Sequence, residues 1–318
     1  SEKIVRAALV ERHDRSAFTL ATKLPTMFLK AEGDQERIFA EQLEKCGVDY
    51  FDYYLLHNLN VANYRKVCQF DSFAFAARMK AEGKIRHVGF SFHDSAELLD
   101  EILTAHPETE FVQLQINYMD WENESIQSRR CYETARRHGK PVVVMEPVKG
   151  GTLARLPEEA EQRFRAVRPE LSPASWAIRY AAGLDGVMMV LSGMSSMEQL
   201  RDNISYMQHF EPLNAEERAA VEDAVGIINR SIAVPCTACR YCVDGCPKQI
   251  AIPEYFALYN NAEQSLNKGF SVQTVYYANL AQTHGRASDC IGCRKCEKSC
   301  PQHLPIVEHL RQVAARFD

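Results

Sequence analysis

Six short apolar runs alternate with longer amphipathic segments over residues 1–229. The apolar runs have the length of buried strands and span residues 18–23, 50–57, 85–91, 111–118, 141–145 and 187–192. Several of the segments between them repeat apolar residues at helical spacing and begin with a capping residue or proline, and these span residues 34–46, 95–106, 125–138, 173–183 and 196–209. This alternation predicts βα units that build a parallel sheet.

Two α/β folds accommodate six such units, a (β/α)8 TIM barrel and a doubly wound sheet. A dinucleotide-binding doubly wound sheet carries a glycine-rich phosphate loop after a strand, whereas Gly150–Gly151 and Gly193 are isolated here. We therefore expect a barrel, whose functional side chains lie at the C-terminal ends of the strands. The polar residues that end the apolar runs are Lys23, His57, residues 91–93, Gln113, Gln115, Asn117, Glu146 and residues 192–195.

Eight of the 11 cysteines form two identical runs, each closed by a proline. The runs are Cys236, Cys239, Cys242 and Cys246, and Cys290, Cys293, Cys296 and Cys300. This is the bacterial pattern of two [4Fe–4S] clusters, in which the fourth cysteine of each run ligates the cluster of the other run. Disulfides would require an oxidising compartment, and zinc sites usually pair two CxxC motifs. The other three cysteines, Cys46, Cys68 and Cys131, are expected to be buried thiols.

The spacer between the two cysteine runs is long and helical in pattern. Residues 250–270 and 271–282 are both predicted helices, whereas a compact ferredoxin has a much shorter, strand-rich spacer. The cysteine-rich tail (residues 230–318) therefore looks like a helical ferredoxin module attached to a larger oxidoreductase. We predict a partial barrel at 1–229 and a small helical domain with two [4Fe–4S] clusters at 230–318.

Composition and charge exclude several classes of protein. Hydrophobic residues make up 46% and charged residues 25% of the 318 residues, as in globular proteins with a large core. No apolar run reaches the ~18 residues of a membrane span, and the polar residues 1–3 do not begin a signal peptide. The net charge of -5 gives no reason to expect nucleic acid. Because [4Fe–4S] clusters are oxygen-sensitive, we expect the reducing cytoplasm.

Four segments occur in the order found in a known enzyme family. LATKLP (20–25), DYYLLHN (52–58), GKIRHVGFS (83–91) and VLSGMSSMEQLRDNI (190–204) resemble the aldo-keto reductases, in particular their bacterial branch with a C-terminal iron–sulfur extension. The resemblance implies an oxidoreductase that transfers hydride from NADPH to a carbonyl. By motif, Lys23 and His57 match the catalytic lysine and histidine of the family.

The family's catalytic tyrosine and aspartate have no counterpart in this sequence. In the family they lie on the second barrel strand, before a helix that residues 1–10 resemble. We therefore expect the first two strands and the first helix to be absent, and the sequence to be a fragment of a longer protein. The competing explanation is a natural product with an open six-stranded sheet and exposed edges. No family motif identifies Tyr53, Tyr54 or Tyr118 as the general acid.

The resemblance also implies a nicotinamide cofactor site. Ser91 matches a serine that binds the nicotinamide amide, and Gln113 matches the glutamine that completes this contact. Gln115 is the alternative match for this glutamine. Phe92 replaces the usual asparagine. Ser192, Ser195, Gln199 and Asn203 match contacts to the adenosine side of the cofactor. Gly193 stands where a basic residue often binds the 2′-phosphate, so both NADP(H) and NAD(H) remain open.

Two functions from different classes follow. The first is an NAD(P)H-dependent oxidoreductase acting on a small carbonyl or alcohol, with two [4Fe–4S] clusters that serve electron transfer with a one-electron redox partner or stabilise the tail. The second is an iron–sulfur electron-transfer or scaffold protein whose barrel has lost reductase chemistry. The absent tyrosine and aspartate favour the second, whereas Lys23, His57, Ser91 and Gln113 favour the first.

Overall fold

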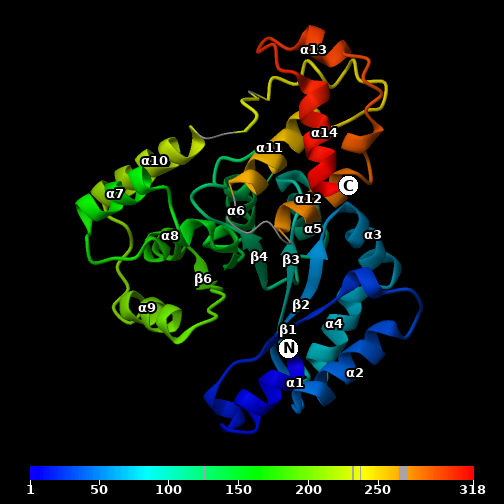
Figure 1. Cartoon of the computed structure of the whole chain (residues 1–318). Coiled ribbons are helices and arrows are strands. Elements are labelled where there is room, and N and C mark those ends of the chain that lie inside the picture. The colour runs from blue at the N-terminus through cyan, green and yellow to red at the C-terminus, as the bar shows by residue number, and fades with distance from the viewer. Residues whose placement is uncertain (125, 231–232, 237, 265–270) are drawn as a thin grey trace. The chain divides into compact units, whose positions relative to one another are not determined.

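The structure is a computed structural model that describes residues 1–124, 126–230, 233–236, 238–264 and 271–318 (Figure 1). Its backbone contacts divide the chain into two compact units. The first comprises Ser1–Leu114 with Arg130–Val143, and the second comprises Gln115–Arg129 with Val144–Asp318. Residue 125, at which the third predicted helix begins, lies outside the described residues.

The predicted strands form one six-stranded sheet in chain order, β1 to β6. The pairings of β1 with β2, β2 with β3 and β3 with β4 are parallel, so the sheet has the strand order of a barrel wall. Each strand overlaps its predicted run, and β1, β2 and β3 extend one or two residues beyond theirs: β1 Ala21–Leu24, β2 Phe51–Leu59, β3 Ile85–Phe92, β4 Phe111–Gln115, β5 Val142–Met145 and β6 Val187–Val190. The (β/α) architecture predicted from the sequence is therefore confirmed.

The first unit carries more helix than the sequence pattern predicts. The segment between β2 and β3, left unassigned above, forms two helices, α3 (Val61–Gln69) and α4 (Ser72–Ala81). They separate at Asp71, whose φ of 53° cannot continue a helix. The remaining helical elements are α1 Glu2–Val5, the π-helix Arg6–Val10, the 3₁₀ turns Arg15–Ala17 and Thr26–Phe28, α2 Asp34–Cys46, α5 Ala96–Ala105 and α6 Ser128–Arg137.

Aromatic residues hold α2 and α4 against the sheet of this unit. Phe39 on α2 lies edge-on to Phe51, Tyr54 and Phe75 at centroid distances of 5.9, 5.1 and 5.9 Å. Of the three cysteines outside the motifs, Cys46 and Cys131 are buried as expected. The expectation was wrong for Cys68, which is exposed because it lies near the C-terminal end of α3, on a side of this short helix that faces solvent.

In the second unit, three helices enclose an apolar core. Phe164 on α7 (Glu158–Val167) stacks on Trp176 of α8 (Pro173–Ala182) at 4.2 Å. α10 (Ala215–Asn229) begins with a capping box in which Glu217 also forms a buried ion pair with Arg179. The other helical elements of this part are the 3₁₀ turn Lys149–Ala154 and α9 Met197–Met207. Met188 and Met189 of β6 are exposed.

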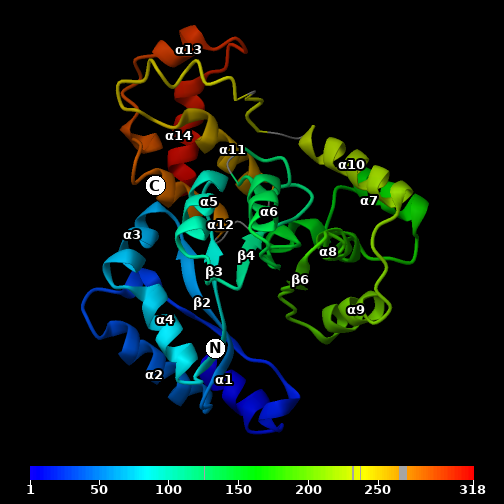
Figure 2. The ribbon, with the colours of Figure 1, turned by 180° about the vertical axis from the view of Figure 1, so that it is seen from behind.

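The cysteine-rich tail is helical, as its pattern predicts. Its elements are α11 Ile252–Glu263, α12 Val272–Leu280, the 3₁₀ turn Ala287–Asp289, α13 Lys295–Ser299 and α14 Ile306–Phe317. Figures 1 and 2 show α11, α12 and α14 packed together, with Tyr255, Phe256 and Leu310 in their core. Residues 265–270 of the first predicted spacer helix lie outside the described residues. No helix in the described part of the chain is both long and apolar enough to cross a bilayer.

Candidate functional site

Lys23 and His57 lie at the C-terminal ends of neighbouring strands. Lys23 on β1 pairs with Leu55 on β2, and His57 follows Leu55 by two residues. Residues two apart in a strand share a face of the sheet, so the two side chains lie on the same face. Buried Gln42 on α2 fixes this geometry, because its amide donates to the Lys23 carbonyl at 2.8 Å and accepts from the Tyr54 hydroxyl at 2.9 Å.

Burial sets the charge state of both side chains. Loss of solvent lowers the pKa of Lys23, and it also lowers the pKa of His57 to about 4, with a further contribution from the positive charge of Lys23. At neutral pH, His57 is therefore an uncharged imidazole with one N–H to donate. Neither side chain makes a hydrogen bond or ion pair with the described residues, so both remain free to bind a substrate oxygen.

His93 forms an electrostatic cluster with Lys23 and His57. From the sequence alone, it was identified only as one of the polar residues that end the apolar run 85–91. It is buried and follows β3 directly. Burial, with smaller contributions from His57 and Lys23, lowers its pKa to about 3. The three side chains are therefore close enough to influence one another. The signal for this residue in the sequence was its position just beyond an apolar run.

A β-bulge in β2 connects His57 to Ser91. The register between β2 and β3 shifts between Leu56 and Leu59, and Asn58 takes up the extra residue with φ 59°. The Asn58 N–H donates to the Ser91 Oγ at 2.9 Å. Ser91 is buried and accepts this bond, which leaves its own hydroxyl proton for another acceptor.

The two candidate glutamines have different surroundings. Gln113 pairs in register with Ser91 on β3, so both side chains share a face. The Gln115 amide donates to Asp120 Oδ2 at 2.8 Å and is thereby engaged in a separate cluster. The contact of either glutamine with a nicotinamide stays a prediction, and the shared register supports Gln113.

A buried ion pair lies where β4 and β5 end. The Lys149 Nζ is 2.5 Å from Asp120 Oδ1, and the two side chains are 3% and 0% exposed. Asn117 donates to Asp120 Oδ2 at 2.7 Å and to the Glu146 carbonyl at 3.1 Å. Burial raises the pKa of Glu146, whose Oε2 accepts from the Gly150 N–H at 2.6 Å. The sequence analysis did not predict this pair.

The loop from β6 to α9 brings its four predicted polar residues together. The Asn203 amide donates to Ser192 Oγ at 2.8 Å, and the Ser195 N–H donates to Gln199 Oε1 at 2.7 Å. These bonds hold the loop above the N-terminus of α9, where backbone N–H groups suit an anion. A Cβ at Gly193 would meet no atom within 4 Å, so this position leaves open space beside the loop.

The eight motif cysteines line two cavities in sets of four. Cys236, Cys239, Cys242 and Cys300 line one, and Cys246, Cys290, Cys293 and Cys296 line the other. Each set contains three cysteines of one run and the fourth of the other, as the motif assigns. Both cavities are otherwise largely apolar, with Ile252 in both walls.

This donor set fits an iron–sulfur cluster. Burial raises the pKa of Cys242 to about 12 and that of Cys296 to about 11, so these thiols do not ionise by themselves at neutral pH. A bound cluster takes thiolates and releases their protons. Four soft sulfur donors around a largely apolar cavity match the ligand set of a [4Fe–4S] centre.

Family comparison agrees with this geometry. The model of the "Aldo/keto reductase family" matches residues 1–225. The chain belongs to the aldo/keto reductase family. In addition, this aldo/keto reductase carries a domain matched by the "4Fe-4S dicluster domain" model over residues 235–305.

Solved structures of other aldo-keto reductases share the fold. The aldo-keto reductase AKR11C1 from Bacillus halodurans (holo form) is 24% identical and superposes with a TM-score of 0.55 over 70% of this chain and 77% of that one. An aldo/keto reductase from Klebsiella pneumoniae, in complex with NADP and acetate, is 19% identical with a TM-score of 0.53 over 70% and 74% of the two chains.

Curated relatives match only a short part of this aldo/keto reductase. Alpha 1 subunits of the acetyl-CoA decarbonylase/synthase complex from Methanosarcina acetivorans and Methanosarcina barkeri are each 27% identical, over 81 and 111 residues. These matches cover 26% and 31% of this chain, but only 8% and 11% of the subunits.

Proposed function

We propose that this oxidoreductase reduces a small carbonyl compound, or oxidises the corresponding alcohol, with NADP(H) or NAD(H). The observation that carries the proposal is the placement of Lys23 and His57 on one face at the ends of β1 and β2. The NADP complex of the Klebsiella pneumoniae structure supports the choice of cofactor class. A cytoplasmic location follows from the same proposal, because thiolate-bound clusters persist in a reducing compartment.

In this proposal the chain's residues stabilise charge that develops on a carbonyl oxygen. Bound NAD(P)H would supply the hydride, and water would supply the proton that converts the alkoxide to the alcohol, because the family's catalytic tyrosine has no counterpart in this sequence. The neutral His57 imidazole donates a hydrogen bond to the oxygen, and the half-buried Lys23 ammonium stabilises its negative charge electrostatically. The Ser91 hydroxyl, whose oxygen already accepts from Asn58, donates its proton toward the carboxamide of the cofactor. Ser192, Ser195, Gln199 and Asn203 shape the loop that would hold the cofactor phosphate.

The test replaces His57 and Lys23 in the full protein and measures carbonyl-dependent NADPH oxidation. We expect His57→Gln and Lys23→Met to lower kcat by about 10²–10⁴-fold while NADPH binding changes little. Lys30→Met, an exposed lysine, is the matched control. Since His57 is neutral above a pKa of about 4, the rate should stay constant below neutral pH until the pH approaches that value. Unchanged kcat in both variants would disprove the assignment.

We also propose that the two cysteine cavities each hold one [4Fe–4S] cluster and that the division between barrel and tail falls after residue 229. Cys236, Cys239, Cys242 and Cys300 would hold one cluster, and Cys246, Cys290, Cys293 and Cys296 the other. The clusters would exchange electrons one at a time with a redox partner.

The two cysteine cavities also support an alternative function, which is electron transfer without carbonyl reduction. The two functions differ in one measurement. Protein with intact clusters that neither binds nor oxidises NADPH, yet passes electrons from dithionite to a one-electron acceptor, would establish the alternative.

A further inference from the structure

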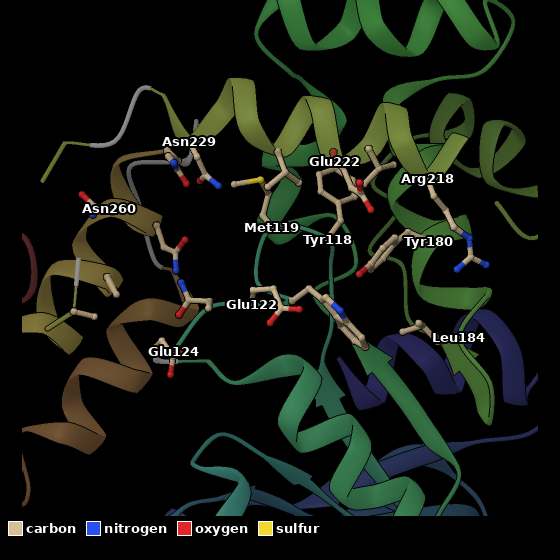
Figure 3. A pocket seen from close by; sticks show the side chains of 18 of the residues that line it. Tyr118, Met119, Glu122, Glu124, Tyr180, Leu184, Arg218, Glu222, Asn229 and Asn260 are labelled. Atoms are coloured by element: carbon tan, nitrogen blue, oxygen red, sulfur yellow. The ribbon is translucent and has the colours of Figure 1, made fainter. Parts of the chain in front are cut away.

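A cavity of about 750 Å³ is lined only by residues of the second unit, and neither Lys23 nor His57 is among them. Its walls come from the loop after β4, from α8 and α10, and from α11 of the tail. Figure 3 shows Tyr118, Tyr180 and Glu222 on one side of it and Asn260 on the other. Its volume is that of a small-molecule site.

Aromatic and aliphatic side chains form most of the wall. Tyr180 lies edge-on to both Tyr118 and Trp121, each at a centroid distance of 6.0 Å. Their flat faces and edges suit another planar ring. The aliphatic part of the lining comprises Met119, Leu184, Leu213, Val221, Val225, Pro253 and Ala257.

Two buried polar groups in this wall have no hydrogen-bond partner in the described part of the chain. They are the Asn261 Nδ2, on a side chain 5% exposed, and the Tyr118 hydroxyl, on one 4% exposed. An unsatisfied buried donor costs free energy unless a ligand or water pairs with it. Both groups can donate a hydrogen bond, and a side-chain rotation that brings either donor to the cavity surface would pair it with an acceptor such as a carbonyl oxygen of the occupant.

The charges of the lining largely cancel. Arg179 is paired with buried Glu217, and Glu122 is paired with Arg129. Arg218 and Glu222 bring opposite charges from α10, and Glu124 is exposed to solvent. The interior therefore favours a neutral molecule over a strongly charged one.

Cys236 connects this cavity with the cysteine sites. It lines both the large cavity and the cavity that it shares with Cys239, Cys242 and Cys300. We infer that the large cavity binds a neutral planar ring with carbonyl acceptors, the chemistry that quinones and isoalloxazines share. Such a ring accepts electrons, and Cys236 places it beside a proposed cluster ligand. The cavity shares no lining residue with the proposed carbonyl-reduction site.

The test measures binding by equilibrium dialysis, using the full chain reconstituted anaerobically with iron and sulfide. The probes are duroquinone, which has no open ring position for a thiol to attack, riboflavin, and durene, which is duroquinone without its carbonyls. We expect duroquinone or riboflavin to bind at one molecule per chain, and durene to bind about tenfold more weakly or not at all. The probe that binds identifies the ring type.

Variants locate the site. Ala257→Phe fills the cavity and should abolish binding, whereas Ala315→Phe on the exposed face of α14 should leave it unchanged. Asn261→Leu, and the similarly sized Asn261→Asp, remove the donor and should weaken binding of the carbonyl ring about tenfold without changing that of durene. Absence of binding by both carbonyl rings, equal binding of durene, or binding that survives Ala257→Phe would overturn the inference. Because the assay contains no NADPH and Ala257 is not part of the proposed carbonyl-reduction site, the loss of binding in Ala257→Phe is independent of the reductase assay.

Discussion

At the scale of single residues, burial decides what the charged groups of this protein do. Lys23 and His57 are partly buried and have no hydrogen-bond or ion-pair partner among the described residues, and burial lowers the pKa of each. Asp120 and Lys149 are more deeply buried, yet they are paired. An unpaired group in a cleft is ready to bind a ligand, whereas a paired group stabilises the loop that carries it.

Removal of one member of the buried pair should destabilise the protein strongly. Lys149→Met leaves the Asp120 carboxylate buried without its cation, and we expect the free energy of unfolding to fall by about 3–5 kcal/mol. The urea midpoint of unfolding is the measurement. Lys45→Met, which breaks an exposed ion pair with Glu41, is the control and should change little. The double variant Asp120→Asn/Lys149→Met should recover part of the loss, and a loss equal to that of Lys45→Met would contradict the argument.

At the scale of elements, the bulge in β2 positions the end of that strand. The extra residue turns the backbone after His57, and the Asn58 N–H reaches the neighbouring strand at Ser91. Bulges commonly re-aim side chains beside functional sites. The catalytic candidates thus depend on one residue in a left-handed conformation.

Replacement of Asn58 should separate backbone strain from chemistry. Asn58→Val places a β-branched residue at φ 59° and should cost about 1–2 kcal/mol of stability and lower the carbonyl-reduction rate, because His57 moves. Asn58→Gly relieves the strain and should retain most of the activity. Asp71→Val, at φ 53° outside the site, should cost stability but not rate. Melting temperature and kcat are the two measurements, and an equal loss of rate in the Asp71 and Asn58 variants would refute a role for the bulge.

At the scale of the whole molecule, an aldo/keto reductase sheet is joined in one chain to a 4Fe-4S dicluster domain. The tail folds so that each cavity draws cysteines from both runs. Residues on either side of a long helical spacer must therefore come together before either set is complete. Cluster binding and folding of the tail should be coupled for this reason.

Iron content tests this crossed arrangement. The anaerobically reconstituted chain should hold about eight iron atoms, and a variant with Cys290, Cys293 and Cys296 all replaced by Ala should hold about four. In that background, Cys300→Ala should lower the remaining iron, whereas Cys246→Ala should not. Cys46→Ala, a buried thiol outside both runs, is the control. The opposite pattern would show that each run ligates its own cluster, and the reciprocal background repeats the test if the triple variant fails to fold.

Local patterns predicted much of this fold. Six apolar runs located six strands, and the segment 34–46 became α2 with the same bounds. Strand and helix formation depend on neighbouring residues, so they can be recognised in a short window. The two helices within residues 61–81 were not predicted, and a single backbone angle at Asp71 separates them.

By itself, the sequence determined the kinds of element, the family resemblance, and the eight cysteines with their spacing. Only the tertiary structure decided which other distant side chains meet: His93 with His57 and Lys23, and Lys149 with Asp120. For Cys300 it agrees with the motif, which already assigned this residue to the first cysteine run. It also decided that Asn261 and Tyr118 line one cavity with unsatisfied polar groups. The periodicity of the sequence indicates on which face of an element a side chain lies. Which distant residue it contacts depends on how whole elements pack together, and a local sequence pattern holds no information about that packing.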